Sequence, residues 1–253
     1  MKIGFIGTGE IAAAMVKGLS GRGHQIMVSE RNAVVSAELA AQFDDVTVAR
    51  NDEVVAGSET VFLCLLADVA RGILVNLPFR ADHSVISAMV DVSVSDLAIL
   101  CAPASDIAIT IPLPSVAVGG SAMPVYPENA ALRALFGDSD VIIPCRSEAA
   151  LNAHFGASSM AATLLDQMRE GAAWLANMTG DPKAAEQYVA TLFAGFLRQT
   201  IEEPHTDFAD ILDSLSTEGG LNATLRAHMR DQAVLDDLTD GMDMLKSRLG
   251  LLD

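Results

Sequence analysis

Short apolar runs alternate with helical segments through the first half of the chain. Several of the runs are apolar at nearly every position, which is typical of parallel strands covered on both faces. The alternation therefore predicts a Rossmann-like, doubly wound α/β sheet, with extra strands at its far edge. Strands are predicted at 2–6, 25–29, 46–48, 60–65, 84–88, 106–110, 119–123 and 140–143, and the first helices at 13–19, 33–43 and 51–57.

Beyond Pro144 the hydrophobic period becomes that of helices, without further clear strands. Asp181 and Pro182 form a good helix start, because the aspartate caps free N–H groups and proline is tolerated in the first turn. Helices are predicted at 147–154, 158–178, 181–202, 208–215, 221–230 and 233–249. We therefore expect two domains, an α/β domain over residues 1–146 and an all-helical domain over residues 147–253.

The strongest local signal is the sequence Gly7-x-Gly9-x-x-Ala12 directly after the first predicted strand. Gly7 permits a tight turn, Gly9 admits a pyrophosphate, and Ala12 allows close packing of the following helix. The amino end of that helix supplies N–H groups and a positive dipole end for the anion. The pattern predicts a dinucleotide site at Gly7, Thr8, Gly9, Glu10, Ile11 and Ala12.

The segment Ser29-Glu30-Arg31-Asn32 follows the second strand, where the adenosine ribose is normally recognised. Glu30 suits the ribose hydroxyls of NAD, whereas Arg31, with Ser29 and Asn32, suits the 2′-phosphate of NADP. An arginine contact and a carboxylate–phosphate repulsion are of similar size, so these residues leave NAD and NADP both open.

Charge and composition narrow the function classes. The net charge of -17 argues against nucleic-acid or membrane partners, because both would be repelled. The start shows no secretory signal, so we expect a cytoplasmic protein. Cys64, Cys101 and Cys145 are widely spaced in apolar segments and should be reduced. The five histidines lack metal-ligand spacing, and we expect no metal.

Three blocks of sequence resemble the pyrroline-5-carboxylate reductase family, and together they span nearly the whole chain. The first is residues 6–15, the second is residues 86–88 with Val92 and Ser93, and the third is residues 218–224. In the third block, Gly219 and Gly220 open a predicted helix at the place of the family's substrate-binding loop. The resemblance implies a homodimer with interleaved carboxyl domains, a role in proline biosynthesis, and NADP(H) in preference to NAD.

The resemblance also implies the remaining site residues. Leu65, Leu66, Ser87 and Pro112 correspond to positions around the cofactor. For the substrate they are Ser158, Ser159, Gly219, Gly220, Asn222 and Thr224. The chain departs from the family at several of these positions. Leu66 and Ala67 replace a Lys-Pro pair, and Leu113 replaces an asparagine. Leu221 and Asn222 replace two threonines, and residues 156–161 replace a Gly-Ser-Gly-Pro-Ala run.

The leading hypothesis is an NAD(P)H-dependent reductase of a small carboxylate-bearing cyclic imine. A protonated imine is already activated, so hydride transfer to its carbon requires orientation more than an obligatory general base, and we assign no catalytic residue. One alternative is a hydroxyacid dehydrogenase-like oxidoreductase, but the lysine that it needs is absent from 158–178, which leaves His154 as a substitute. The other is a non-catalytic NAD(P)-binding sensor that uses the altered pocket.

Overall fold

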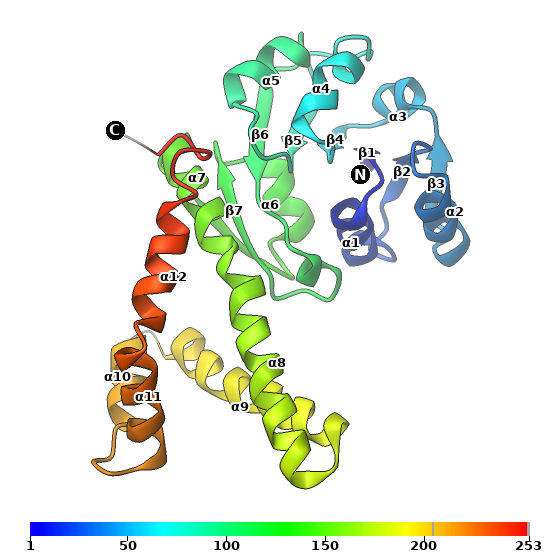
Figure 1. Ribbon diagram of the computed structural model, residues 1–253. Coiled ribbons are helices and arrows are strands. Elements are labelled where there is room, and N and C mark those ends of the chain that lie inside the picture. The colour runs from blue at the N-terminus through cyan, green and yellow to red at the C-terminus, as the bar shows by residue number, and fades with distance from the viewer. Residues whose placement is uncertain (204, 252–253) are drawn as a thin grey trace. The chain divides into compact units, whose positions relative to one another are not determined.

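The computed structural model describes residues 1–203 and 205–251, which form two compact units. The first unit contains Met1–Phe155 together with the last described residues from Arg248 onward, and the second is Gly156–Ser247. The boundary expected between residues 146 and 147 falls between β8 (Val141–Pro144) and α7 (Glu148–Ser158). Figure 1 shows the sheet of the first unit and the long helices of the second.

The first unit is built on an eight-stranded sheet with the order β3-β2-β1-β4-β5-β6-β7-β8. Neighbouring strands are parallel except β6 and β7, which are antiparallel. The prediction of a doubly wound sheet with extra edge strands is confirmed. The strands before β8 are β1 (Lys2–Ile6), β2 (Gln25–Ser29), β3 (Val46–Ala49), β4 (Thr60–Leu63), β5 (Ser84–Ser87), β6 (Asp106–Thr110) and β7 (Ala122–Tyr126).

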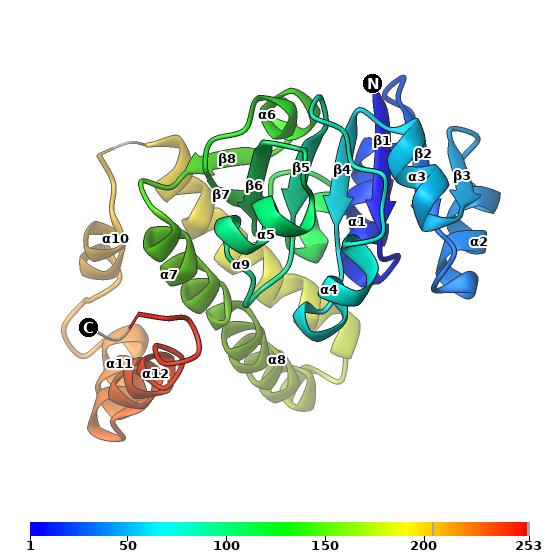
Figure 2. The same cartoon turned by 90° about the horizontal axis from the view of Figure 1, so that it is seen from above.

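Helices cover both faces of this sheet and create two cores (Figure 2). Phe62 of β4 faces one core, where it stacks on Phe5 with ring centroids 4.9 Å apart, while Val61 and Leu63 face the other. The first core is covered by α1 (Glu10–Leu19), α2 (Ala33–Gln42), the 3-10 helix η1 (Pro114–Ala117) and α6 (Ala130–Phe136). The second is covered by α3 (Asn51–Gly57), α4 (Ala67–Leu74), α5 (Val94–Leu100) and α7.

The second unit is helical throughout its described elements. Its helices are α8 (Met160–Thr179), α9 (Pro182–Glu202), α10 (Phe208–Ser214), α11 (Leu221–Asp231) and α12 (Val234–Asp243). The start predicted for α9 is confirmed, since the Asp181 side chain accepts the Ala184 N–H at 3.0 Å. Among the described apolar side chains of this unit, only Ala172, Ala185 and Ile211 are buried. None of the helices in the described ranges is long and apolar enough to cross a membrane.

Several predicted boundaries were wrong, and three of them have a clear physical reason. The last helix ends at Asp243 rather than Leu249, because residues 244–249 form successive turns, including the bond from Leu245 N–H to Met242 O. Ser158 ends α7 instead of starting the next helix. The strand predicted at 119–123 begins at Ala122, because Gly119 and Gly120 have φ of +80° and +75°, outside the range of a strand.

Candidate functional site: a cleft at the carboxyl edge of the sheet

The glycine turn follows β1 and is fixed by β2. Gly7 has φ +92°, and a Cβ there would lie 2.3 Å from the carbonyl oxygen of Cys64. The Gly7 N–H donates to Ser29 Oγ at 2.9 Å, and Thr8 Oγ1 donates to the Ser29 carbonyl at 2.6 Å. Thr8 and Ser29 are both buried. The Ser29 hydroxyl therefore supports the turn, and its contact with a ribose phosphate stays a prediction.

Gly9 lies at the start of α1 and keeps space open in front of it. No atom comes within 4 Å of the position that a Cβ would occupy. Gly9, Glu10, Ile11 and Ala12 all line a cleft of about 710 Å³. Free space beside a backbone N–H group at a helix start is the requirement of a bound pyrophosphate, so the turn fits a dinucleotide.

A second cavity of about 370 Å³ adjoins the first across the turn. The two share Gly9, Cys64, Leu65 and Leu66. These residues follow β1 and β4, so the combined cleft lies at the carboxyl ends of the parallel strands, where open α/β sheets bind their ligands. The cavities thus form an extended site with the glycine turn in its middle.

Arg31 and Asn32 line the smaller cavity, together with Gly7 and Thr8. Among the described residues, no carboxylate pairs with Arg31, and Glu30 lines neither cavity. The Asn32 side chain accepts the Val35 N–H at 3.4 Å and caps α2. Arg31 is thus the charged group that this end of the cleft offers to an anion.

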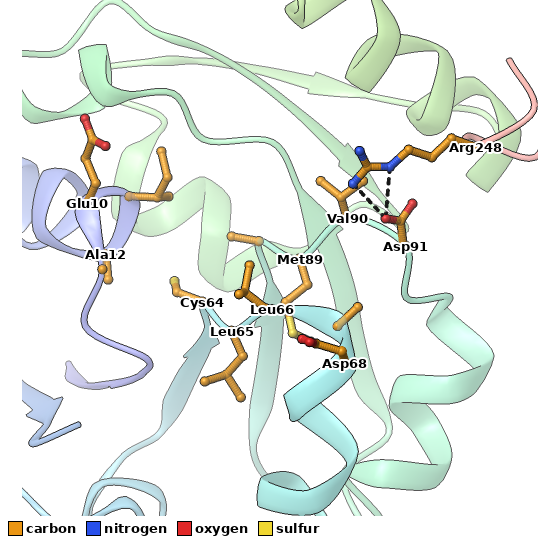
Figure 3. A pocket seen from close by; sticks show the side chains of 14 residues that line it. Glu10, Ala12, Cys64, Leu65, Leu66, Asp68, Met89, Val90, Asp91 and Arg248 are labelled. Carbon is orange, nitrogen blue, oxygen red and sulfur yellow. Dashed lines mark hydrogen bonds and ion pairs between the residues drawn. The ribbon is translucent and has the colours of Figure 1, made fainter. Parts of the chain in front are cut away.

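The other end of the cleft is formed by residues after β4 and β5 (Figure 3). Leu66 is 74% exposed and stands at the start of α4. Asp91, with φ +65°, accepts hydrogen bonds at Oδ2 from Nε and Nη2 of Arg248, at 3.2 and 3.0 Å. Sequence reasoning missed Met89, Asp91 and Arg248. Arg248 lay in a segment predicted as helix, which gave no signal that it meets Asp91.

Two of the predicted cofactor residues, Ser87 and Pro112, lie outside the two cavities, whereas Cys64 lines both. Ser87 is buried, and its hydroxyl accepts the Met89 N–H at 3.1 Å, which holds the loop after β5. Pro112 is buried as well. Burial raises the pKa of the Cys64 thiol to about 12, so this cysteine stays protonated at neutral pH and is a poor nucleophile.

The predicted substrate residues all lie in the second unit. Ser158 is the last residue of α7, and the Ser159 hydroxyl donates to Gly156 O at 2.6 Å. Gly219 has φ +70°, and Gly220 precedes the first residue of α11. The Thr224 hydroxyl donates to Gly220 O at 3.0 Å, within its own helix. Asn222 lines a cavity of about 230 Å³ with Leu212, Leu215, Ser216, Leu225 and Arg226. Their role in substrate binding stays a prediction.

The described residues contain no group of histidine, cysteine and acidic side chains placed to hold a metal ion. The described cysteines 64, 101 and 145 are free thiols.

A doubly wound sheet with a glycine turn and a cleft at its carboxyl edge defines the class of dinucleotide-binding folds. Residues 2–91 match the family described as NADP oxidoreductase coenzyme F420-dependent. No curated protein matches the sequence. The solved structures with a similar fold extend the likeness to the whole chain.

Two of these structures are pyrroline-5-carboxylate reductases. The enzyme of Streptococcus pyogenes is 19% identical, covers 100% of this chain and 99% of its own, and has a TM-score of 0.82. The Plasmodium falciparum enzyme, solved with NADP bound, is 12% identical, with coverages of 99% and 98% and a TM-score of 0.83.

A more distant structure is the reductive aminase from Aspergillus terreus in complex with NADPH and ethyl levulinate. It is 18% identical, covers 96% of this chain and 93% of its own, and has a TM-score of 0.58. The chain therefore has a fold similar to those of pyrroline-5-carboxylate reductases and, more distantly, to that of this reductive aminase. The resemblance read from the three sequence blocks is confirmed at the level of the fold.

Proposed function

We propose that the protein is an NADPH-dependent reductase of a small carboxylate-bearing cyclic imine, similar to pyrroline-5-carboxylate reductase. The observation that carries the proposal is the extended cleft, which runs from Arg31 past the glycine turn to Met89 and Asp91. Its length and its position at the carboxyl edge suit a dinucleotide with a small substrate beside it. On this proposal the protein acts in the cytoplasm, in proline biosynthesis.

Particular residues fit the parts of the cofactor. The backbone at Gly7 and Gly9 and the amino end of α1 would hold the pyrophosphate, and Arg31 would pair with the 2′-phosphate. Leu65, Leu66 and Met89 give an apolar wall at the other end. When bound, NADPH supplies the hydride. Because Glu30 lines neither cavity, the structure favours NADP(H), with NAD(H) as the weaker ligand.

The chain's own contribution to the reaction is orientation, exclusion of water and electrostatics. A protonated imine accepts hydride at carbon and becomes an amine, so the nitrogen already carries the proton that it needs. The carboxylates of Glu10 and Asp68 line the cleft and would favour that cationic form. No protein base is required, in agreement with a cleft in which Cys64 is a protonated thiol.

The second candidate function is a sensor that binds NAD(P) without turnover. Leucines occupy two positions that are polar in the resembled family, and both are strongly exposed, Leu66 at 74% and Leu221 at 91%. Neither can donate a hydrogen bond through its side chain. Because both leucine side chains lie at the surface, they do not disturb the core. Their effect would therefore fall on ligand binding rather than on the stability of the protein.

Turnover and binding, measured on the same preparation, test the two candidates. NADPH oxidation is followed with 1-pyrroline-5-carboxylate and with 1-pyrroline, while calorimetry gives the dissociation constants of NADPH, NADH and coenzyme F420. We expect tight NADPH binding and reduction of the carboxylated imine. NADPH binding without reduction of either imine favours the sensor, and the absence of any nucleotide binding contradicts both. Oxidation of hydroxy acids with NADP as the acceptor would instead indicate a hydroxyacid dehydrogenase.

A further inference from the structure

Arg248 is the single lysine or arginine among the described residues that line the 710 Å³ cleft. It lies beside Met89, Val90 and Asp91, at the end away from Glu10 (Figure 3). It also lines an adjoining cavity of about 260 Å³ with Asp91, Ser93 and Asn152. The positive charge in the cleft is therefore concentrated at one place, on the side of the turn opposite Arg31.

Asp91 holds the arginine in a fixed orientation. Nε and Nη2 of Arg248 both donate to Oδ2 of Asp91, at 3.2 and 3.0 Å. In the described part of the chain, Nη1 has no hydrogen-bond partner. The guanidinium is a planar group with five N–H donors. Because Asp91 takes one from Nε and one from Nη2, the remaining N–H groups are available to a second anion.

The surroundings strengthen a charged contact at this place. Most of the neighbouring lining is apolar, namely Leu65, Leu66, Ala67, Ala88, Met89 and Val90. Apolar walls lower the local dielectric when a ligand displaces water, and a charge pair gains more energy there than in bulk water. The arginine side chain itself is 70% exposed, so a small ligand can reach it without a rearrangement of the core.

We propose that Arg248 binds the carboxylate of the substrate, and that Asp91 is the residue that positions it. The inference rests on the proposed function, since it names the group that would distinguish a carboxylated imine from an uncharged one. The guanidinium would hold the carboxylate at the Asp91 end of the cleft, and the cationic nitrogen would lie toward the carboxylates of Asp68 and Glu10. The charges of an iminium carboxylate and of the cleft are then complementary.

The test compares two ligands of nearly the same size and shape, of which only one is charged. Tetrahydrofuran-2-carboxylate and its uncharged carboxamide are titrated by calorimetry into the full chain saturated with NADPH. Arg248→Ala should weaken carboxylate binding about tenfold, toward the low end for a charged contact because the side chain is exposed. It should leave carboxamide and NADPH binding unchanged. Arg248→Lys should recover part of the loss, because the charge remains.

Two further variants make the result specific. Lys246→Ala is the matched control, because this exposed lysine pairs with Asp243 in the same segment and lines neither cavity. It should bind both ligands as the unaltered protein does. Asp91→Asn keeps an acceptor oxygen for Arg248 but removes a competing negative charge, so carboxylate binding should tighten.

The outcomes separate this inference from the proposed function. Equal carboxylate binding by Arg248→Ala and Lys246→Ala overturns the inference, as does an unaltered protein that does not bind the carboxylate. Weaker carboxylate binding by Asp91→Asn contradicts the expectation that a neutral acceptor oxygen keeps Arg248 in position while a competing charge is removed. Carboxylate binding that depends on Arg248, without reduction of any imine, upholds the inference and removes the reductase function. Imine reduction that is unaffected by Arg248→Ala upholds the reductase function and overturns the inference.

Discussion

Gly7 and Gly9 belong to one turn but have different physical reasons for being glycine. At Gly7 the backbone has φ +92° and Cys64 O blocks a Cβ, so the reason lies in the fold. At Gly9 no protein atom is near, so the reason lies in the ligand. The same residue type therefore predicts two different outcomes on substitution.

We expect Gly9→Asp to fold normally and to lose dinucleotide binding, because the new carboxylate fills the space for the pyrophosphate and repels it. Gly7→Ala should lower stability by about 2 kcal/mol or more, because its Cβ meets a carbonyl oxygen in an unfavourable conformation. Thermal unfolding and NADPH calorimetry on both variants check this. A Gly9→Asp protein that folds and binds NADPH normally would show that the nucleotide site lies elsewhere.

Arg31 determines the cofactor preference in our interpretation. Arg31→Ala should weaken NADPH about tenfold or more while changing NADH little, because only NADPH carries the 2′-phosphate. Glu30→Ala should preserve or improve NADPH binding, because a nearby negative charge is removed. Dissociation constants for both cofactors decide the matter. Equal losses for NADPH and NADH in Arg31→Ala would contradict the assignment to the phosphate.

At the scale of elements, strands were easier to predict than helix ends. Strand β2 was predicted with its observed bounds, because an apolar run between turn residues leaves little choice. The end of α12 was missed because Met244, Leu245 and Leu249 keep a helical spacing, while the backbone there forms turns. The spacing of apolar residues indicates which side chains are buried together. It does not indicate which backbone hydrogen bonds form.

The residues of the candidate site also differ in how far they can be predicted from their neighbours in the sequence. The sequence could place residues 7–12 and Arg31 at the cleft, because they directly follow strands β1 and β2. Asp91 and Arg248 are 157 positions apart, and only the folded chain brings them together. Ser29 was predicted to contact the ribose phosphate, and the structure adds that its buried hydroxyl bonds to the turn, which a sequence pattern cannot reveal.

The loop between α4 and β5 predicts a dependence of stability on pH. His83 is fully buried, its Nδ1 accepts the Arg80 N–H at 3.0 Å, and its Nε2 has no partner in the described ranges. Burial, followed by the charge of Arg80, lowers the pKa of His83. The unfolded chain therefore takes up the proton first. The ordinary pKa of histidine is about 6.5, and above this pH the contribution of His83 to stability is complete. The contribution falls as the pH drops from there toward the lowered pKa of His83 in the folded protein.

His83→Asn keeps an acceptor for the Arg80 N–H and removes the titrating ring. We expect it to be less stable near neutral pH, because packing against Phe79 is lost, but to lose less stability on acidification. Urea unfolding between about pH 7.5 and 5.5 measures this slope. His228→Asn, at an exposed position, is the control. A slope in His83→Asn as steep as in the unaltered protein would refute the explanation.

At the scale of the whole molecule, the second unit leaves large apolar side chains uncovered. Trp174 is 65% exposed and Met178 66% on α8, while Tyr188 is 59% exposed and Ile201 78% on α9. Apolar surfaces of this kind usually mark an interface between subunits. We therefore propose the homodimer with interleaved carboxyl domains that the family resemblance implies.

Light scattering at micromolar concentration should give the mass of a dimer. Trp174→Glu should weaken dimerisation by at least roughly tenfold, because large aromatic anchors carry much of the energy of an interface. Arg71→Glu, an exposed charge change on the first unit, should not. A monomeric mass for the unaltered protein would contradict the dimer.

In a verified dimer, mixing Gly9→Asp with Gly220→Trp subunits tests whether two chains share one site. Each parent protein should be inactive, and only a shared site would restore activity in the hybrid.

The return of the chain to the first unit at Arg248 has a practical consequence for the design of expression vectors. Arg248, Leu249 and Gly250 line the cavity next to the cleft, so an affinity tag fused to the carboxyl end would begin within a few residues of the site. Met1 precedes β1, whose amino end lies at the edge of the sheet opposite the cleft. Affinity tags therefore belong at the amino end. Weak substrate binding by a protein tagged at the carboxyl end would be an effect of the tag rather than a property of the site.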